Sequence, residues 1–352
     1  MSENTESSIA LYRKYRPSKF GEVLGQDHIV DVLKGAIELG NVSHAYLFSG
    51  SRGTGKTSIA RILAEEIGCK KEDLYEIDAA SNRGIDDIRD LKESVKTLPF
   101  NSPYKVYIID EVHMLTKEAF NALLKTLEEP PKYVVFVLAT TELEKLPETV
   151  VSRCQGFVFK KPSQEILKQI TLTISKKEGY EIDPASADLI ALLGDGSFRD
   201  TQGILQKVIS ASSDKKISRE EVEKITGAPS GVLVDDFISA IAKKDLEKGL
   251  NSVNKASGQN IDMKIYLKLV LRKMRAILLL RFAQEMKKDL EENFSKEDIK
   301  FLEELAKDKE TNISSKILLR LLESYNDIGY SHISQLPVEL ALIDIIRDNS
   351  QE

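Results

Sequence analysis

The residues whose types and spacing best suit chemistry form one segment, Gly50-Ser-Arg-Gly-Thr-Gly-Lys-Thr57. It matches the pattern G-x-x-x-x-G-K-S/T in full, in which glycines let backbone N–H groups surround a phosphate group. We expect Lys56 to reach the β- and γ-phosphates of ATP and the Thr57 hydroxyl to ligate Mg²⁺. The predicted phosphate-binding residues are Gly50, Ser51, Arg52, Gly53, Thr54, Gly55, Lys56, Thr57 and Ser58. The segment therefore predicts a site for ATP and Mg²⁺.

Two neighbouring carboxylates, Asp110 and Glu111, follow the apolar run 106–109. By itself an acidic pair after an apolar run is most often a solvated turn, but downstream of a complete P-loop it indicates catalysis. Asp110 can hold the hydrated Mg²⁺, and Glu111 can orient and deprotonate the water that attacks the γ-phosphate. Glu111 therefore indicates hydrolysis of ATP and not binding alone.

Hydroxyl and guanidinium groups stand at further element boundaries. Thr140 and Thr141 follow the apolar run 133–138, where a hydroxyl either contacts the γ-phosphate or the attacking water, or caps the end of a strand. Arg153 lies in a Ser-Arg-Cys sequence and Arg199 ends a Gly-Ser-Phe-Arg sequence. From the residue types alone, each arginine is more often a surface ion-pair partner than a catalytic group.

These residues need a scaffold, and apolar runs alternate with helical patterns around them. The expected strands are 45–48, 74–78, 106–109, 133–138 and 156–159, and the expected helices are 27–39, 57–68, 85–97 and 119–128. Continuous apolar strands that alternate with helices are typical of a parallel sheet with both faces covered. The expected fold class is therefore α/β, with the P-loop between a strand and a helix, as phosphate binding requires.

Beyond 160–162 the strand signals stop, and every later pattern is helical. The helical patterns are 164–178, 184–194, 199–211, 218–225, 232–243, 245–256, 262–288, 296–308, 313–328 and one after Pro337. The segment 227–231 (Gly-Ala-Pro-Ser-Gly) is a linker signal between the first four patterns and the rest. We therefore expect a nucleotide-binding domain at 1–162, a small helical domain at 163–228 and a second helical domain at 229–352.

Length and composition limit the class of protein. The chain has 352 residues, of which 41% are apolar and 30% charged, as is ordinary for a folded protein of two or three domains. Its 50 Lys and Arg against 56 Asp and Glu give a net charge of −6, which excludes a simple basic DNA-coating protein but not a local basic surface. Cys69 and Cys154 are too few for a disulfide framework or a four-cysteine zinc site.

The sequence offers no segment suited to a membrane or to export. Residues 1–8 are polar and lack the basic and apolar regions of a signal peptide. The longest apolar-looking stretch, 265–282, carries five basic residues, which favours a buried amphipathic helix over a membrane span. We expect a cytoplasmic protein without a membrane partner.

Several motifs occur together as they do in one known family. They are LYRKYRP at 11–17, HAYLFSG at 44–50, EIDAAS at 76–81, YIIDEVHML at 107–115, NALLKTLEEPP at 121–131, LATT at 138–141, SRC at 152–154 and GSFRD at 196–200. On these residues and the P-loop, the chain resembles the clamp-loader branch of AAA+ ATPases, and most closely the gamma/tau family of bacterial DNA polymerase III. The resemblance runs from 11 to about 211, whereas beyond 232 only the length and the helical character agree.

The resemblance implies an AAA+ P-loop ATPase domain, a helical lid and an all-helical collar. It also implies that Arg153 is an arginine finger acting on ATP held by a neighbouring subunit, and that Arg199 is the sensor-2 residue of its own subunit. Thr141 matches sensor 1, with Thr140 beside it. The catalytic residues implied in this way are Glu111, Lys56, Arg153, Thr141 and Arg199, and those flanking the adenine are Tyr12, Arg13, Pro17 and Val23.

The resemblance also implies a contact with DNA at Asn82 and Arg83, which open the expected helix 85–97. Members of the family follow template phosphates with this segment inside a spiral of subunits, so an acidic chain can still bind DNA. Phosphate contacts carry no sequence information, and we therefore expect binding that depends on DNA structure and on salt. The alternative is that Arg83 pairs with Asp86 or Asp87 on its own helix.

The chain departs from the family in two places. Members usually carry a four-cysteine zinc module before EIDAAS, whereas here the chain runs from Cys69 through 70–74 straight into that segment, so we expect no zinc. The chain also stops after 348–352 without a proline- and charge-rich extension, and so resembles the short form of the family. Its last helices would form an oligomerisation collar, whose apolar stripe is buried either between subunits or within the chain; the stripe comprises Ile317, Leu318, Leu321 and Leu322.

The function that the resemblance implies is that of an ATP-hydrolysing motor subunit of a clamp loader, within a holoenzyme classed as a DNA-directed DNA polymerase, a transferase. Expected partners are clamp-loader subunits of the delta and delta-prime type, the sliding clamp, primer-template DNA and further copies of the chain. An archaeal or eukaryotic-type small subunit is disfavoured by the sequence at 111–115. A non-hydrolysing scaffold of the delta-prime kind is disfavoured by the intact P-loop and acidic pair, and a branch-migration motor by the sequence at 152–154 and the collar length.

Overall fold

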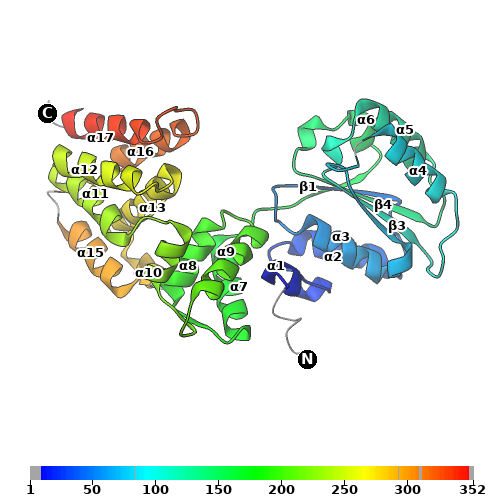
Figure 1. The fold of residues 1–352 in the computed structure, drawn as a ribbon, viewed down its shortest axis with the longest axis horizontal. Coiled ribbons are helices and arrows are strands. Elements are labelled where there is room, and N and C mark those ends of the chain that lie inside the picture. The colour runs from blue at the N-terminus through cyan, green and yellow to red at the C-terminus, as the bar shows by residue number, and fades with distance from the viewer. Residues whose placement is uncertain (1–8, 83, 292, 309–310, 349–352) are drawn as a thin grey trace. The chain divides into compact units, whose positions relative to one another are not determined.

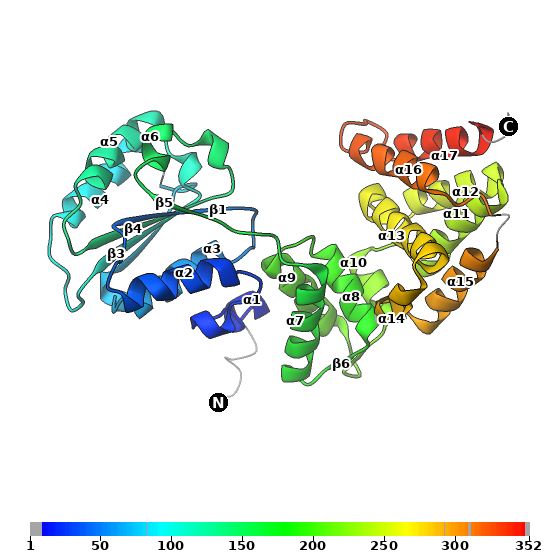
Figure 2. The same ribbon diagram turned by 180° about the vertical axis from the view of Figure 1, so that it is seen from behind.

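The computed structural model describes residues 9–82, 84–291, 293–308 and 311–348. The chain packs into two compact units (Figures 1 and 2). Unit 1 comprises Met1–Leu167 and Gly194–Gly203, and unit 2 comprises Lys168–Leu193 and Ile204–Glu352. The expected division into three domains stays a prediction, because residues of the segment 163–228 are shared between the two units.

Unit 1 is built on a parallel sheet of five strands, in the order β2-β3-β4-β1-β5. The strands are β1 (Ala45–Ser49), β2 (Leu74–Asp78), β3 (Lys105–Asp110), β4 (Val134–Thr140) and β5 (Gln155–Val158), so the five expected strands are confirmed. In the register of the central pair, Ser49 lies opposite Thr140. Because all strands run in one direction, the P-loop after β1, the carboxylates at the end of β3 and the threonines at the end of β4 lie at one edge of the sheet.

Helices cover both faces of this sheet (Figure 1). On one face α2 (Asp27–Glu38) and α3 (Lys56–Glu66) pack on alternate strand residues such as Val135 and Val137. On the other face α4 (Ile85–Val95), α5 (Lys117–Glu128) and α6 (Glu148–Val151) pack on the intervening residues, such as Val134 and Phe136. Every residue of β4 is buried, which explains why its sequence reads as one continuous apolar run. The expected α/β class is confirmed.

Unit 2 is almost entirely helical. Its helices, including two that start in residues of unit 1, are α7 (Gln164–Lys177), α8 (Pro184–Leu193), α9 (Phe198–Ala211), α10 (Arg219–Thr226), α11 (Gly231–Lys243), α12 (Leu246–Gly258), α13 (Met263–Phe282), α14 (Lys287–Glu291), α15 (Lys296–Lys307), α16 (Ser315–Asp327) and α17 (Leu336–Asp348). The expectation that strands stop after 160–162 is wrong in one detail, since β6 (Glu181–Ile182) and β7 (Lys216–Ile217) form a small parallel pair. Two residues are too few to give a strand pattern in the sequence.

The single helix expected at 262–288 is also wrong, because α13 ends at Phe282. The backbone leaves the helical conformation at Ala283 (φ −141°, ψ 71°), before α14 begins. Arg281, in the last turn of α13, donates hydrogen bonds from its guanidinium to the carbonyl oxygens of Leu305 (3.0 Å) and Ile313 (2.9 Å). These tertiary contacts attach the last turn of α13 to later residues, and the apolar periodicity of the sequence does not reveal them.

The apolar stripe predicted for the last helices is only partly covered within the chain. Ile317 and Leu321 of α16 are buried, whereas Leu322 is 48% exposed and the neighbouring Leu319 is 61% exposed. Packing within unit 2 therefore accounts for one side of α16, and the other side presents leucines to the surface.

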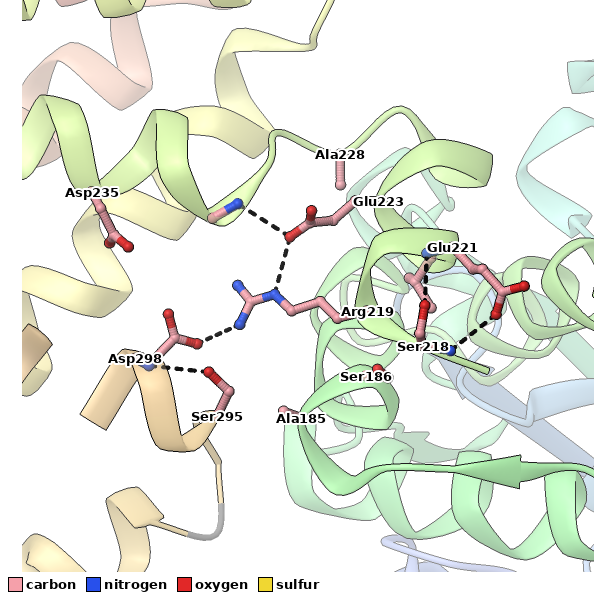
Figure 3. A network of polar contacts seen from close by, with 12 residues as sticks. Ala185, Ser186, Ser218, Arg219, Glu221, Glu223, Ala228, Asp235, Ser295 and Asp298 are labelled. Atoms are coloured by element: carbon pink, nitrogen blue, oxygen red, sulfur yellow. Dashed lines mark hydrogen bonds and ion pairs between the residues drawn. The ribbon is translucent and has the colours of Figure 1, made fainter. Parts of the chain in front are cut away.

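A polar network joins α10 to the helices that follow the linker (Figure 3). The Arg219 guanidinium pairs with Glu223 (Nε–Oε1 3.0 Å) and with Asp298 of α15. The Lys273 ammonium of α13, which is buried, pairs with the same Asp298 and with Asp235 of α11 (2.7 Å). Burial opposes ionisation of Asp298, but the charges of Lys273 and Arg219 outweigh it and lower the pKa of this carboxyl group. The network thus holds residues on both sides of the linker in one compact unit.

Within the described residues, no single helix has both the length and the apolar character needed to cross a membrane. One sharply bent pair, Arg219–Thr226 with Gly231–Lys243, meets the length and composition requirements only when its two helices are taken together.

Candidate active site

The P-loop is a tight backbone turn between Ser49 of β1 and Lys56 of α3. Gly50 (φ +144°) and Gly53 (φ +74°) adopt conformations that disfavour other residues, and neither has space for a side chain. A Cβ atom would lie 2.6 Å from the Phe159 carbonyl oxygen at the first position and 2.0 Å from the Ser197 Oγ at the second. The two glycines therefore let the loop pass close to two distant segments of unit 1.

One of these segments, 194–203, carries Arg199 to the P-loop. The backbone N–H of Phe198 donates a hydrogen bond to the Gly53 carbonyl oxygen (2.9 Å). The Arg199 guanidinium lies over the ring of Tyr12, with Cζ 4.9 Å from the ring centroid. The structure therefore brings together the P-loop, the predicted sensor-2 residue and one predicted adenine contact.

Gln26 supports the same loop and was not among the predicted site residues. Its side chain is fully buried and donates to the carbonyl oxygens of Lys160 (2.7 Å) and Thr54 (3.4 Å). Its Oε1 accepts a hydrogen bond from the Lys160 N–H (3.2 Å). The only signal in the sequence is a Gly25-Gln26 dipeptide, whose partners lie up to 134 residues away.

Lys56 is buried at the start of α3, where its Nζ donates to the carbonyl oxygens of Gly50 (2.7 Å) and Ser51 (3.0 Å). Burial lowers the pKa of this lysine, while the nearby carboxylates of Glu111 and Asp110 oppose that shift. Of the other predicted phosphate-binding side chains, Thr54 is buried and donates to the Ser51 carbonyl oxygen (2.9 Å), whereas Arg52 is exposed. The structure thus places one cation and two carboxylates around the loop.

The two predicted Mg²⁺ ligands meet directly. The Thr57 Oγ1 donates a hydrogen bond to the Asp110 Oδ2 (2.8 Å). The described residues contain no cluster of three or more His, Cys, Asp or Glu side chains suited to a metal ion. Mg²⁺ does not need such a cluster, because in phosphate sites it is held by one or two protein oxygens together with phosphate oxygens and water. A hydroxyl beside a carboxylate, next to a phosphate-binding loop, fits that ion.

Glu111 turns the chain after β3 with a left-handed backbone (φ 49°), which is uncommon for a residue other than glycine. Its Oε2 accepts a hydrogen bond from the Thr141 Oγ1 (3.0 Å). Thr140, by contrast, is fully buried and bonds to His113 (3.0 Å). Of the two adjacent threonines, it is therefore Thr141 that contacts the predicted catalytic carboxylate.

Arg153 follows α6 and is engaged within its own chain. Its guanidinium pairs with Glu128 (2.6 Å) and donates to the Thr149 carbonyl oxygen (2.6 Å), and its side chain is 33% exposed. This is the surface ion pair that the residue type alone suggested. Its role toward a neighbouring subunit stays a prediction.

The N-terminal segment adds further positive charge near Arg199. Tyr12 of α1 (Leu11–Lys14) also lies beside the Arg13 guanidinium, and its pKa is lowered by a hydrogen bond from Arg13 and by the charges of Arg13 and Arg199. Arg16, in the same segment, is half-buried; burial and the neighbouring arginines 61, 199 and 13 lower its pKa. A group of arginines beside the P-loop suits a polyphosphate ligand.

The remaining predicted ligand-binding residues are placed less decisively. Val23 packs against the core of unit 1 and Pro17 is half-buried, so their contact with adenine stays a prediction. Asn82 is exposed and donates to the Asp78 carbonyl oxygen (3.1 Å), and Arg83 lies outside the described residues. Its two suggested partners have other contacts: Asp86 pairs with Arg89 (2.8 Å), and Asp87 accepts from the Gly84 N–H (3.0 Å).

The two cysteines are unpaired thiols in separate places. Burial raises the pKa of Cys69 and of Cys154 to about 11 in each case, which disfavours the thiolate that zinc requires. The absence of bound zinc nevertheless stays an expectation for elemental analysis.

Two family models match the chain. The model described as "DNA polymerase III, delta subunit" matches residues 25–83 and 72–163, and the model "DNA polymerase III subunits gamma and tau domain III" matches residues 217–351. The second match covers the region beyond 232, where the sequence alone showed only a compatible length and helical character.

Curated relatives agree with these matches. The chain is 40% identical over 304 residues to DNA polymerase III subunit tau of Bacillus subtilis, covering 80% of this chain and 54% of the relative. It is 39% identical over 278 residues to DNA polymerase III subunit gamma/tau of Mycoplasma pneumoniae, covering 73% and 41% respectively. The chain therefore spans about half the length of these relatives.

The fold is also similar to that of solved structures. RuvB, the Holliday junction branch migration motor of Thermotoga maritima, superposes with a TM-score of 0.52 over 72% of this chain and 90% of the other. The sequence identity is 21%, so this likeness supports the AAA+ fold alone.

The grouping with DNA-directed DNA polymerases, which are transferases, is not right for the chain itself. The matched relatives are gamma/tau subunits, and the fold that carries the site is that of an AAA+ ATPase. From these relatives and from the delta and gamma/tau domain matches, the chain belongs to the gamma/tau family of DNA polymerase III subunits.

Proposed function

We propose that the chain hydrolyses ATP with Mg²⁺ as the motor subunit of a clamp loader. The observation that carries the proposal is the pairing of side chains at one edge of the sheet. Thr57 meets Asp110, and Thr141 meets Glu111, beside the same P-loop. The first pair fits the metal and the second fits a base with its partner, so the site has groups for hydrolysis as well as for binding.

Each residue has a distinct part in this proposal. The backbone N–H groups of 50–57 and the Lys56 ammonium hold the phosphates, and Arg199 reaches the γ-phosphate from the segment beside Gly53. Thr57 and Asp110 would hold Mg²⁺, which supplies positive charge against the phosphate oxygens. Glu111 accepts the proton of the attacking water, while the hydrogen bond from Thr141 fixes the direction of its carboxylate.

Arg153 completes the site of a neighbouring subunit in this proposal. Its guanidinium, one-third exposed, already lies against the Glu128 carboxylate at the surface. Exchange of that carboxylate for a phosphate oxygen preserves a charge-assisted hydrogen bond, and the planar guanidinium suits either partner. Turnover would then depend on assembly of the chain with further copies or with related subunits.

The family membership supports the wider role. The proposed partners are clamp-loader subunits of the delta and delta-prime type, the sliding clamp, primer-template DNA and other copies of the chain. Asn82 and Arg83 would contact the phosphates of the DNA, and the exposed side of α16, including Leu319 and Leu322, would contribute to a collar between subunits. Such a protein acts in DNA replication, and the proposal places it in the cytoplasm.

The test is the rate of ATP hydrolysis by the purified chain and its candidate partner subunits, with and without primer-template DNA and sliding clamp. The proposal predicts turnover that DNA and clamp together stimulate strongly. ATP binding without turnover under every condition would support a non-hydrolysing scaffold instead. Strand separation without clamp dependence would support a branch-migration motor.

A further inference from the structure

His113 is a buried histidine that the proposed reaction does not use. It lies in the short 3-10 helix Val112–Met114 after Glu111, and its side chain is 5% exposed. Its two ring nitrogens both face a distant segment, the end of β4. Nδ1 lies 3.0 Å from the Thr140 Oγ1, and Nε2 lies 3.2 Å from the Glu142 Oε1.

The first contact is a hydrogen bond and the second is an ion-pair distance, and the partners indicate which nitrogen carries the ring proton. Glu142 also pairs with the Lys145 ammonium (2.7 Å), whose hydrogen bond lowers the pKa of this carboxyl group, and a carboxylate can only accept. When the ring proton lies on Nε2, facing this acceptor, Nδ1 accepts a hydrogen bond from the Thr140 hydroxyl; this tautomer is assigned from the contacts. The Thr140 oxygen in turn accepts from the backbone N–H of Glu142 (3.0 Å).

These three contacts form a closed cycle through the turn 140–142. The turn carries Thr141 at its centre, and the Thr141 Oγ1 donates to the Glu111 Oε2 (3.0 Å). His113 Nδ1 lies 3.5 Å from the same Glu111 oxygen, so the ring also limits the space in which the carboxylate can move. The cycle fixes the turn, the turn aims the Thr141 hydroxyl, and the hydroxyl orients the carboxylate.

We propose that His113 is a positioning residue for ATP hydrolysis, which acts through the Thr140–Glu142 turn to hold Thr141 against Glu111. The inference rests on the proposed ATPase function. A positioning role for His113 differs from a purely structural role, because a histidine that only filled the core would affect folding and ATP binding as much as turnover. It also predicts that loss of His113 adds nothing once Thr141 has lost its hydroxyl.

A double-mutant cycle measures this dependence directly. His113→Ala, Thr141→Val and the combined variant are compared for kcat of ATP hydrolysis and for ATP affinity, in the full chain assembled with its partners. One oriented hydrogen bond to a carboxylate is worth about 1.5–3 kcal/mol, so each single change should lower kcat by roughly 10- to 100-fold. The combined variant should be no slower than Thr141→Val, and the ATP dissociation constant should stay within about twofold, the change expected when ground-state binding is untouched.

A second route avoids the cavity left by His113→Ala. Thr140→Val removes the hydroxyl from the cycle with little change of shape and should lower kcat, whereas Thr140→Ser keeps the hydroxyl and should restore it. His44→Ala is the matched control, since this exposed histidine precedes β1 at the end of the strand opposite the P-loop.

The outcomes separate this inference from the function on which it rests. Wild-type turnover with an unchanged kcat in His113→Ala, multiplicative losses in the combined variant, or no recovery in Thr140→Ser would each overturn the role of His113 alone. ATP binding without turnover in the wild-type chain under every condition would overturn the proposed function and this inference with it.

Discussion

Asp298 offers the sharpest test of what holds unit 2 together. Its side chain is 6% exposed and accepts from Arg219, which is 22% exposed (Figure 3). It also accepts from Lys273, which is 3% exposed. Asp298→Ala leaves Arg219 with Glu223 and leaves the buried Lys273 with Asp235 alone. Removal of one partner from a buried ion pair costs about 3–5 kcal/mol, because the remaining charge stays buried without full compensation. Since each cation keeps one acceptor, we expect about 3 kcal/mol.

This cost can be measured by differential scanning calorimetry of the full chain. For a unit of this size, each kcal/mol shifts Tm by about 2–4 °C, so Asp298→Ala should lower the Tm of unit 2 by roughly 6–12 °C. Asp344→Ala is the matched control, because Asp344 and its partner Arg320 are 48% and 39% exposed. An exposed pair contributes about 0–1 kcal/mol, and the Tm should shift little. ATP binding should persist in both variants, since these residues lie in unit 2.

A further variant tests the reason for the effect. If an uncompensated charge causes the loss, the pair Lys273→Met and Asp298→Leu should recover at least half of it, because two apolar side chains replace two ions of similar size. Equal shifts in Asp298→Ala and Asp344→Ala would refute the reasoning. The reasoning would also be refuted if the Lys273→Met and Asp298→Leu double variant lost as much stability as the two single changes added together.

Three further predictions follow from the same structure. The pKa of Asp298 is lowered in the folded chain, so its contribution to stability is complete at neutral pH and is lost as the pH falls through that pKa. The difference in unfolding free energy between wild type and Asp298→Ala should therefore shrink below about pH 4, the ordinary carboxyl range. Gly53→Ala should weaken ATP binding at least about tenfold in titration calorimetry. A left-handed backbone costs a residue with a side chain about 1–2 kcal/mol, and the new Cβ atom would meet the Ser197 Oγ. The control is Gly35→Ala, whose new Cβ atom meets nothing within 4 Å and which should bind ATP as wild type does. Arg153→Ala and Glu111→Gln chains should each hydrolyse ATP poorly alone but recover turnover when mixed, because a neighbour's intact arginine then serves an intact Glu111; no recovery on mixing would contradict action between subunits.

Local patterns predicted the parts of this site that depend on neighbours in the sequence. The P-loop, Asp110 and Glu111 each follow an apolar run, and parallel strands bring their carboxyl ends to one edge. The choice between Thr140 and Thr141 needed the structure, because both follow the same strand and only their surroundings differ. The family resemblance favours Thr141, whose hydroxyl is the one that contacts Glu111; its part in hydrolysis stays a prediction.

Residues whose contacts are distant in the chain were missed. Gln26 bonds to a carbonyl 134 residues away, and His113 bonds to a threonine 27 residues away. In the sequence each lies in a short motif that does not show which distant residues it contacts, so nothing marks it as buried. The end of α13 at Phe282 was missed as well; Arg281 beside it contacts carbonyl groups 24 and 32 residues later in the chain.

The central claim, that this site hydrolyses ATP, is tested most directly by Glu111→Gln. The amide keeps the shape of the carboxylate and can still accept the hydrogen bond from Thr141, but it cannot take a proton from water. Loss of a general base lowers turnover by about 10²–10⁴-fold, and we expect a loss of this size with ATP affinity within about twofold of wild type. Steady-state hydrolysis at the wild-type rate, with ATP binding intact, would contradict the account.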